Sequence, residues 1–137
     1  MKRLKPILIV DDDADDRYLI IRAFRDTVLA DKLQFAVNGA DALKYLDALP
    51  RDAELPGLIV LDLNMPILDG ISTLNLLKSS SRYKDIPVVI FTTSANPTEK
   101  KRCMDLGAAD FIVKPNTYSG LKLSAQLLHN FVGDKTE

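Results

Sequence analysis

The sequence is poor in several features that mark particular classes of protein. It has one cysteine, Cys103, and no tryptophan in 137 residues, and its 18 lysines and arginines do not outnumber its 19 aspartates and glutamates. One cysteine excludes a disulfide framework and a metal site built from several cysteines, and fits a reducing compartment. The lack of a basic excess argues against nucleic acid as the main partner. No apolar run approaches the roughly 18 residues of a membrane helix. We therefore expect a cytoplasmic protein without a membrane segment.

What remains is the composition of an ordinary globular domain. Hydrophobic residues make up 47% of the chain and charged residues 27%, which is close to the average for folded proteins. The length suits one domain with one core. We expect a single domain over residues 1–137, with its core at about 5–131 and a short frayed tail over 133–137.

Short apolar runs alternate with segments of helical periodicity. The runs have little polar alternation, which is typical of strands buried on both faces; they cover 6–10, 33–37, 58–61, 88–91 and 111–113. In the first intervening segment Ile20, Ile21, Phe24 and Val28 share one helical face. Before the fourth helix, Asn96 is a candidate cap that precedes a proline at the first helical position. This order predicts a doubly wound α/β fold, with helices on both faces of a five-stranded parallel sheet.

Polar residues follow the predicted strands at the edge where such sheets bind ligands. Asp11 and Asp12 follow the first strand, Asp62 the third, Thr92 the fourth and Lys114 the fifth. Several carboxylates held together repel one another unless a cation neutralises them, and oxygen ligands without histidine or thiolate favour Mg²⁺. A metal, an ammonium and a hydroxyl suit a phosphoryl group, and an aspartate can be its nucleophile.

Five motifs in this order resemble one family. The stretches at 7–13, 37–43, 61–70, 88–94 and 106–115 read ILIVDDD, VNGADAL, LDLNMPILDG, VVIFTTS and LGAADFIVKP. Together they are similar to the receiver domain of two-component response regulators, and in particular to the stand-alone, chemotaxis-regulator-like members. The resemblance implies a flavodoxin-like (αβ)5 three-layer sandwich with strand order 2-1-3-4-5.

The resemblance also implies roles at the metal site. Asp62 would accept a phosphoryl group from a phosphohistidine on a sensor histidine kinase or a phosphotransfer protein. Asp12 and Asp62 would bind Mg²⁺ directly, Asn64 through its backbone carbonyl and Asp11 through a water molecule.

The resemblance further implies residues that bind the phosphoryl group or move in response to it. Lys114 would pair with its oxygens, and the Lys114–Pro115 peptide bond would be cis. Thr92 would move to hydrogen-bond the group, and the ring of Phe111 would turn inward as Thr92 moves. The resulting change would signal to a downstream protein target, and the fourth helix, fifth strand and fifth helix would form the readout surface and a possible homodimer interface. Because the resemblance covers nearly all of the 137 residues, we expect no DNA-binding output domain.

Two other functions compete with this interpretation. A haloacid-dehalogenase-like phosphohydrolase also uses an aspartate nucleophile with Mg²⁺, but around Asp62 its second acid is replaced by Asn64. A receiver-like binding module without phosphorylation is disfavoured because each required side chain is present. The receiver interpretation predicts a signalling domain, not an enzyme, whose only chemistry is its own phosphorylation and dephosphorylation. The sequences of the motifs and the charged loop before the third strand resemble those of regulators that act with phytochrome-type kinases.

Overall fold

A computed structural model describes residues 2–132 and 134–136. Its main sheet has five parallel strands in the spatial order β3-β2-β4-β5-β6. These are β2 (Ile7–Val10), β3 (Leu33–Ala36), β4 (Leu58–Leu61), β5 (Val88–Thr92) and β6 (Asp110–Val113). Counted along the chain, this is the order 2-1-3-4-5, which confirms the predicted fold.

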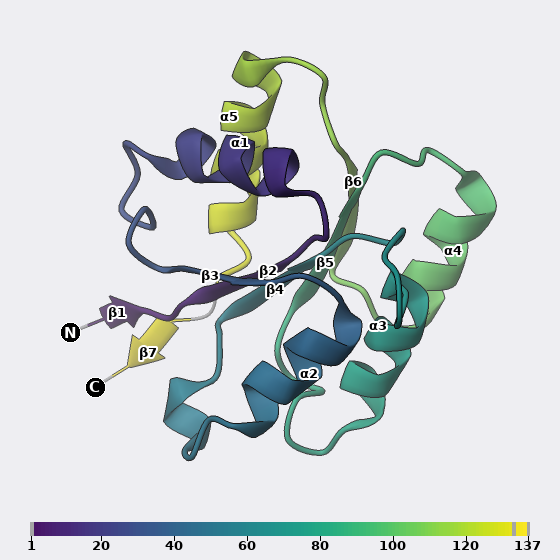
Figure 1. Ribbon diagram of the computed structural model, residues 1–137. Coiled ribbons are helices and arrows are strands. Elements are labelled where there is room, and N and C mark those ends of the chain that lie inside the picture. Colours follow the sequence, from purple (N-terminus) through teal and green to yellow (C-terminus); the bar gives the residue numbers. More distant parts are fainter. Residues whose placement is uncertain (1, 133, 137) are drawn as a thin grey trace.

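Helices cover both faces of this sheet, so the fold has three layers (Figure 1). They are α1 (Ala14–Phe24), α2 (Gly39–Asp47), α3 (Gly70–Ser79), α4 (Pro97–Asp105) and α5 (Tyr118–His129). Helices α1 and α5 pack together over one face, and α2, α3 and α4 lie over the other. Two separate hydrophobic clusters result, one on each side of the sheet. Within the described residues, no helix combines the length and the hydrophobicity needed to cross a membrane.

The central strands form because their side chains are apolar on both faces. Every residue of β2 and β4 is buried, and so is every residue of β5. Burying such strands on both faces removes few polar side chains from water, and parallel sheets are usually buried under helices on both faces. Their carboxyl ends therefore lie side by side at one edge of a rigid layer.

Side-chain caps begin each of the five helices. The caps are Asp13, Asn38, Asp69, Asn96 and Thr117, and each accepts a hydrogen bond from at least one amide of the first turn. These bonds satisfy amides that would otherwise lack a partner, which typically contributes about 1 kcal/mol per helix. The predicted cap of the fourth helix at Asn96 is confirmed.

Two predictions at the ends of elements differ from the structure. Of the predicted frayed tail, Asp134–Thr136 form strand β7, which pairs with β1 (Lys2–Leu4) in an antiparallel ladder; residues 133 and 137 lie outside the described residues. Strands β1 and β7 lie side by side, apart from the main sheet (Figure 1). Helix α1 is shorter than predicted, because it ends at Phe24 and leaves Val28 65% exposed.

A further short element, the 3-10 turn at Asp52–Glu54, lies in the charged loop before β4.

Candidate functional site

Three of the predicted site residues follow directly after a strand, and the backbone amide of each donates one more hydrogen bond to the neighbouring strand. The amide of Asp11 donates to Ala36 O at 3.0 Å, and the amide of Asp62 donates to Val10 O at 3.1 Å. The amide of Lys114 donates to Thr92 O at 2.7 Å. Each of these residues is therefore fixed by a neighbouring strand, and their side chains leave the sheet at its carboxyl edge.

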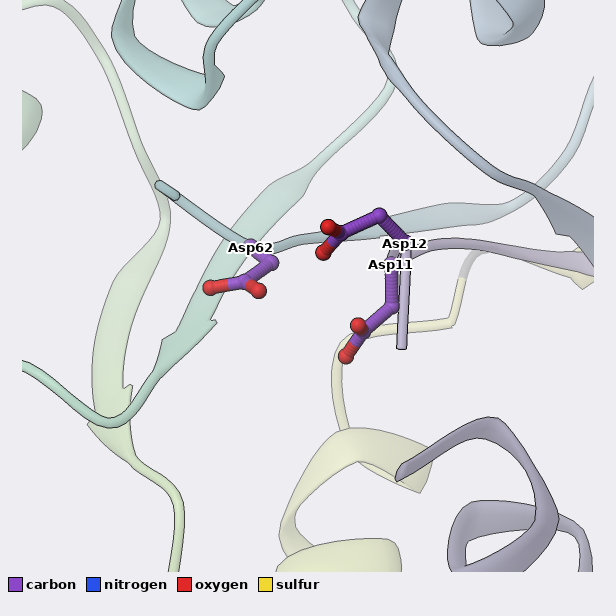
Figure 2. Close-up of side chains that lie close together, drawn as sticks. All are labelled: Asp11, Asp12 and Asp62. Carbon is purple, nitrogen blue, oxygen red and sulfur yellow. The ribbon is translucent and has the colours of Figure 1, made fainter. Parts of the chain in front are cut away.

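Three carboxylates meet there. Asp11 and Asp12 follow β2, Asp62 follows β4, and all three side chains face a common space (Figure 2). One oxygen from each lies within 4.8 Å of the other two. Asp11 and Asp62 are buried, at 2% and 8% exposure, while Asp12 is exposed. The sequence prediction that these three acids converge is confirmed.

Lys114 reaches across the same space with its ammonium group. Nζ lies 2.7 Å from Asp11 Oδ2, 2.9 Å from Asp16 Oδ2 and 3.5 Å from Asp62 Oδ2. Burial disfavours the charged ammonium, but hydrogen bonds to Asp11 and Asp16 outweigh it and raise the pKa of Lys114 above its ordinary value. Lys114 is therefore a buried cation that offsets part of the charge of the cluster.

Asp11 has a partner for each of its carboxylate oxygens. Oδ1 accepts from the amide of Asp13 at 2.9 Å, and Oδ2 accepts from Lys114. Burial raises the pKa of Asp11 above its ordinary value, while the bonds to Lys114 and to the amide of Asp13 act against this rise. The main-chain carbonyl of Asp11 also accepts from Arg17 at 2.7 Å. Asp11 is thus firmly oriented, with its oxygens already engaged.

Asp62 differs from Asp11 in this respect. Its Oδ1 is buried and has no hydrogen-bond partner among the described residues. A buried charged oxygen without a partner is costly, and such groups usually bind a metal or another donor. Three carboxylates with one orphaned oxygen and no histidine or thiolate form a donor set that fits a hard divalent cation.

The loop after Asp62 returns closely to the site. Helix α3 begins at Gly70, where a Cβ atom would lie 2.3 Å from Asp62 O. Only glycine allows this approach, so Gly70 fixes how the start of α3 packs against Asp62. Within the loop, Ile67 has a φ of 70° and a side chain that is 85% exposed. A β-branched residue is strained in this left-handed region.

Asn64 lies at the open side of the cluster. It is exposed, and with Asp12 and Glu99 it lines a hollow of about 470 Å³. The hydroxyl of Ser94 donates to Glu99 Oε1 at 2.7 Å, which fixes the Glu99 side chain near the start of α4. This hollow gives a second molecule access to Asp12 and Asn64.

Thr92 is the last residue of β5, and Phe111 is the second residue of β6. Thr92 is fully buried, and its Oγ1 accepts a long 3.5 Å hydrogen bond from the amide of Ser94. The sequence predicted that the ring of Phe111 turns inward on switching, yet this ring is already inside, at 7% exposure in the cluster on the side of α2, α3 and α4. Phenylalanine has no hydroxyl to hydrate, so burial is favourable for it.

The expectation of a cis Lys114–Pro115 bond is wrong. The described residues contain no cis peptide bond. Lys114 Nζ reaches Asp11 and Asp16 with the trans bond, so the lysine needs no cis bond for its approach. The trans form is also the intrinsically favoured one for a bond before proline.

Asp16 is the site residue that sequence reasoning missed. It lies in the first turn of α1, and its carboxylate binds Lys114 Nζ. The sequence showed a run of acids after the first strand, but nothing in the run distinguishes Asp16 from its neighbour Asp15. Only the start of α1, which Asp13 sets by capping, decides which acid faces the lysine.

Comparison with known proteins agrees with this geometry. The family model for the response regulator receiver domain matches residues 7–126. The phosphorylated cyanobacterial phytochrome response regulator RcpA has a similar structure, with a TM-score of 0.83 and 31% identity over 95% of this chain and 94% of that one. The Mn²⁺-bound response regulator Rcp1 gives a TM-score of 0.77 and 28% identity, with 93% of both chains covered.

A curated relative supports the same assignment. The probable methanogenesis regulatory protein FilR2 of Methanothrix harundinacea is 30% identical over 91% of this chain and 81% of its own length. These comparisons do not favour the phosphohydrolase or the unphosphorylated binding module. A receiver domain signals through phosphorylation by a histidine kinase or phosphotransfer partner, and the described residues include no DNA-binding domain. The chain belongs to the family of response regulator receiver domains of two-component systems.

Proposed function

We propose that Asp62 is the phosphoacceptor of this receiver domain and that residues of about 5–131 form the working unit. The observation that carries this proposal is the buried Asp62 Oδ1, which has no hydrogen-bond partner among the described residues. It lies in a cluster with Asp11 and Asp12 and beside Lys114. Of the three acids, Asp62 is thus buried beside the lysine and still has an oxygen free for chemistry.

The proposed reaction transfers a phosphoryl group between two nucleophiles. A carboxylate oxygen of Asp62 attacks phosphorus, the bond between phosphorus and the histidine nitrogen breaks, and the electron pair leaves with the nitrogen. The product is an acyl phosphate, which adds about one negative charge to the carboxylate it replaces. Lys114 donates hydrogen bonds to the phosphoryl oxygens and offsets their charge. Asp11 positions Lys114 for this contact through their 2.7 Å hydrogen bond.

We propose Mg²⁺ as the resident cation. Asp12 and Asp62 would bind it directly, Asn64 through its backbone carbonyl and Asp11 through water. The engaged oxygens of Asp11 support its indirect role, because neither is free of a protein donor. When bound, Mg²⁺ supplies charge neutralisation for the carboxylates and the phosphoryl oxygens. The donor set of carboxylate and carbonyl oxygens supports Mg²⁺ over softer metals.

The signal would leave through Thr92 and the elements around it. Thr92 is fully buried at the end of β5, so a hydrogen bond from its hydroxyl to the phosphoryl group would shift the loop that leads to α4. The buried ring of Phe111 would be the second element of the switch; it lies on β6 opposite Ile90 of the neighbouring strand, two positions before Thr92. We propose the surface of α4, β6 and α5 as the readout for a downstream protein and as a possible homodimer interface. Exposed Met104, Val113 and Leu127 on these elements support this choice.

We propose that the protein is cytoplasmic and that its upstream partner is a sensor histidine kinase of the phytochrome type or a phosphotransfer protein. The likeness to RcpA, which is described as a phytochrome response regulator, supports this choice. The single cysteine supports a reducing compartment. The protein would turn over its own acyl phosphate and no external substrate, so we propose a signalling role without enzymatic activity on other molecules.

The test uses a small phosphodonor. The protein is incubated with Mg²⁺ and acetyl phosphate, and the intact mass is measured for the wild type, Asp62→Asn and the control Asp110→Asn, which lies at the start of β6. We expect one phosphoryl adduct on the wild type and on the control, and none on Asp62→Asn. An adduct that persists in Asp62→Asn would refute the assignment. Steady phosphate release from unrelated phosphomonoesters would favour the hydrolase.

A further inference from the structure

Lys114 divides its hydrogen bonds unequally among the acids of the site. Its Nζ lies 2.7 Å from Asp11 and 2.9 Å from Asp16, but 3.5 Å from Asp62. An ammonium has three N–H donors, and the two short contacts use two of them. The lysine is therefore held toward Asp11 and Asp16 and farther from Asp62, the residue to which we assign phosphorylation.

The position of Asp16 follows from the start of α1. The side chain of Asp13 accepts hydrogen bonds from the amides of Asp15 and Asp16, at 2.8 Å and 3.1 Å. These bonds hold the first turn of the helix and so set the position of the Asp16 backbone. The Asp16 carboxylate then points to Lys114, whereas Asp15 is exposed and makes no side-chain contact with the lysine.

The two short partners of Lys114 differ in their access to water. The Asp11 side chain is 2% exposed, and the Asp16 side chain is 34% exposed. Asp16 and Lys114 also line a common cavity of about 410 Å³. If Lys114 moves toward Asp62, water can replace it at Asp16 but not at Asp11. Asp16 is thus the partner that Lys114 can exchange at low cost.

Charge leads to the same conclusion. Asp11, Asp16 and Asp62 each have an oxygen within 3.5 Å of the Lys114 ammonium, and Asp12 adds a further carboxylate beside Asp11 and Asp62. A phosphoryl group on Asp62 adds further negative charge and oxygens that need the same donor. The Asp16 carboxylate opposes this change twice, because it repels the new charge and holds the lysine that would neutralise it.

We propose that Asp16 is a positioning residue that competes with the phosphoryl oxygens on Asp62 for the ammonium of Lys114. This proposal rests on the function proposed above. By this competition, Asp16 makes the phosphorylated form of Asp62 less favourable. Replacing its carboxylate with an amide releases Lys114 and favours a tetrahedral anion at Asp62.

Beryllofluoride with Mg²⁺ serves as the probe, because it imitates a phosphoryl group on a carboxylate without a covalent donor. Its apparent affinity is measured by NMR titration of the full chain, and the affinity for Mg²⁺ alone is measured in parallel. We expect Asp16→Asn to bind beryllofluoride about fivefold more tightly than the wild type, as the loss of one partly exposed ion pair implies. Its affinity for Mg²⁺ should not rise, because Asp16 is no metal ligand. Asp16→Glu, which keeps a carboxylate, should return toward the wild type.

Asp15→Asn is the matched control, since it removes the same charge one residue away without touching Lys114. Equal tightening in Asp15→Asn and Asp16→Asn would overturn the proposal and leave only a general charge effect. Weaker binding of both probes by Asp16→Asn would also overturn it, because the residue would then be structural. Asp62→Asn tests the proposed function separately from the role of Asp16. If the wild type and Asp62→Asn bind beryllofluoride equally, the assignment of Asp62 fails, and the role of Asp16 fails with it.

Discussion

The replacement of Lys114 by methionine should destabilise the fold strongly in the absence of divalent metal. The methionine keeps the length and the apolar stem of the lysine but removes the ammonium that three carboxylates share. Asp11 and Asp62 each have an oxygen in the group that lies within 4.8 Å. At an effective dielectric constant of about 20, two charges at this separation repel by about 3.5 kcal/mol. Removing one partner of a buried ion pair typically costs about 3–5 kcal/mol. Because Asp16 is partly hydrated, we expect a loss of about 3 kcal/mol.

The pKa of Lys114 gives the sign of the pH dependence. This pKa is raised above its ordinary value of 10.5 in the folded protein. The charged lysine therefore stabilises the fold fully below 10.5, and this contribution is lost only as the pH rises through the higher folded-state value. The difference between Lys114→Met and the wild type should thus stay constant between neutral and mildly alkaline pH.

Urea unfolding in EDTA and in Mg²⁺ measures these effects. Lys101→Met is the control, because Lys101 forms a 2.8 Å ion pair with Asp105 on the surface, where both side chains are mostly exposed. This control should leave the free energy of unfolding nearly unchanged. Mg²⁺ should narrow the deficit of Lys114→Met, because the cation replaces the lost charge. Equal stability of Lys114→Met and the wild type in EDTA, or a deficit that widens with Mg²⁺, would refute the reasoning.

Three further outcomes follow from single side chains. Asp62→Asn should lose most of the stabilisation by Mg²⁺, which for the wild type reaches about 2.7 kcal/mol when the Mg²⁺ concentration is a hundred times the Kd. Thermal unfolding with and without Mg²⁺ measures this stabilisation. An unchanged response to Mg²⁺ would exclude Asp62 as a ligand. Ile67→Gly should raise the free energy of unfolding by about 1 kcal/mol, because it relieves the positive φ at little loss of packing. Ile67→Ala keeps a Cβ and should show no such gain in urea unfolding. Cys103 is fully buried, and burial raises the pKa of its thiol, so a thiol reagent should label it only after unfolding; rapid labelling of the native protein would contradict this burial.

The sheet was predictable because its chemistry is local. Each strand of the main sheet is a short apolar run, and parallel strands buried on both faces have this composition for a clear physical reason. The convergence of Asp11, Asp62 and Lys114 followed from their places directly after strands, since parallel strands end at one edge. The cap at Asn96 was readable for the same reason, because capping depends on a few consecutive residues.

Features that depend on tertiary contacts were not predictable. Strands β1 and β7 pair through the backbone at opposite ends of the chain, and their few residues show no apolar pattern. The contact between Asp16 and Lys114 spans 98 positions and depends on where α1 begins. The inward ring of Phe111 depends on packing in the folded chain, which a motif does not encode.

Identification of the modified side chain tests the central claim most directly. The protein is phosphorylated with acetyl phosphate and Mg²⁺, and then reduced with borohydride, which converts an aspartyl phosphate to homoserine. Peptide mass spectrometry locates the homoserine. We expect it at Asp62 and not at Asp11 or Asp12. Homoserine at another aspartate, with Asp62 unchanged, would contradict the assignment of Asp62 as the phosphoacceptor.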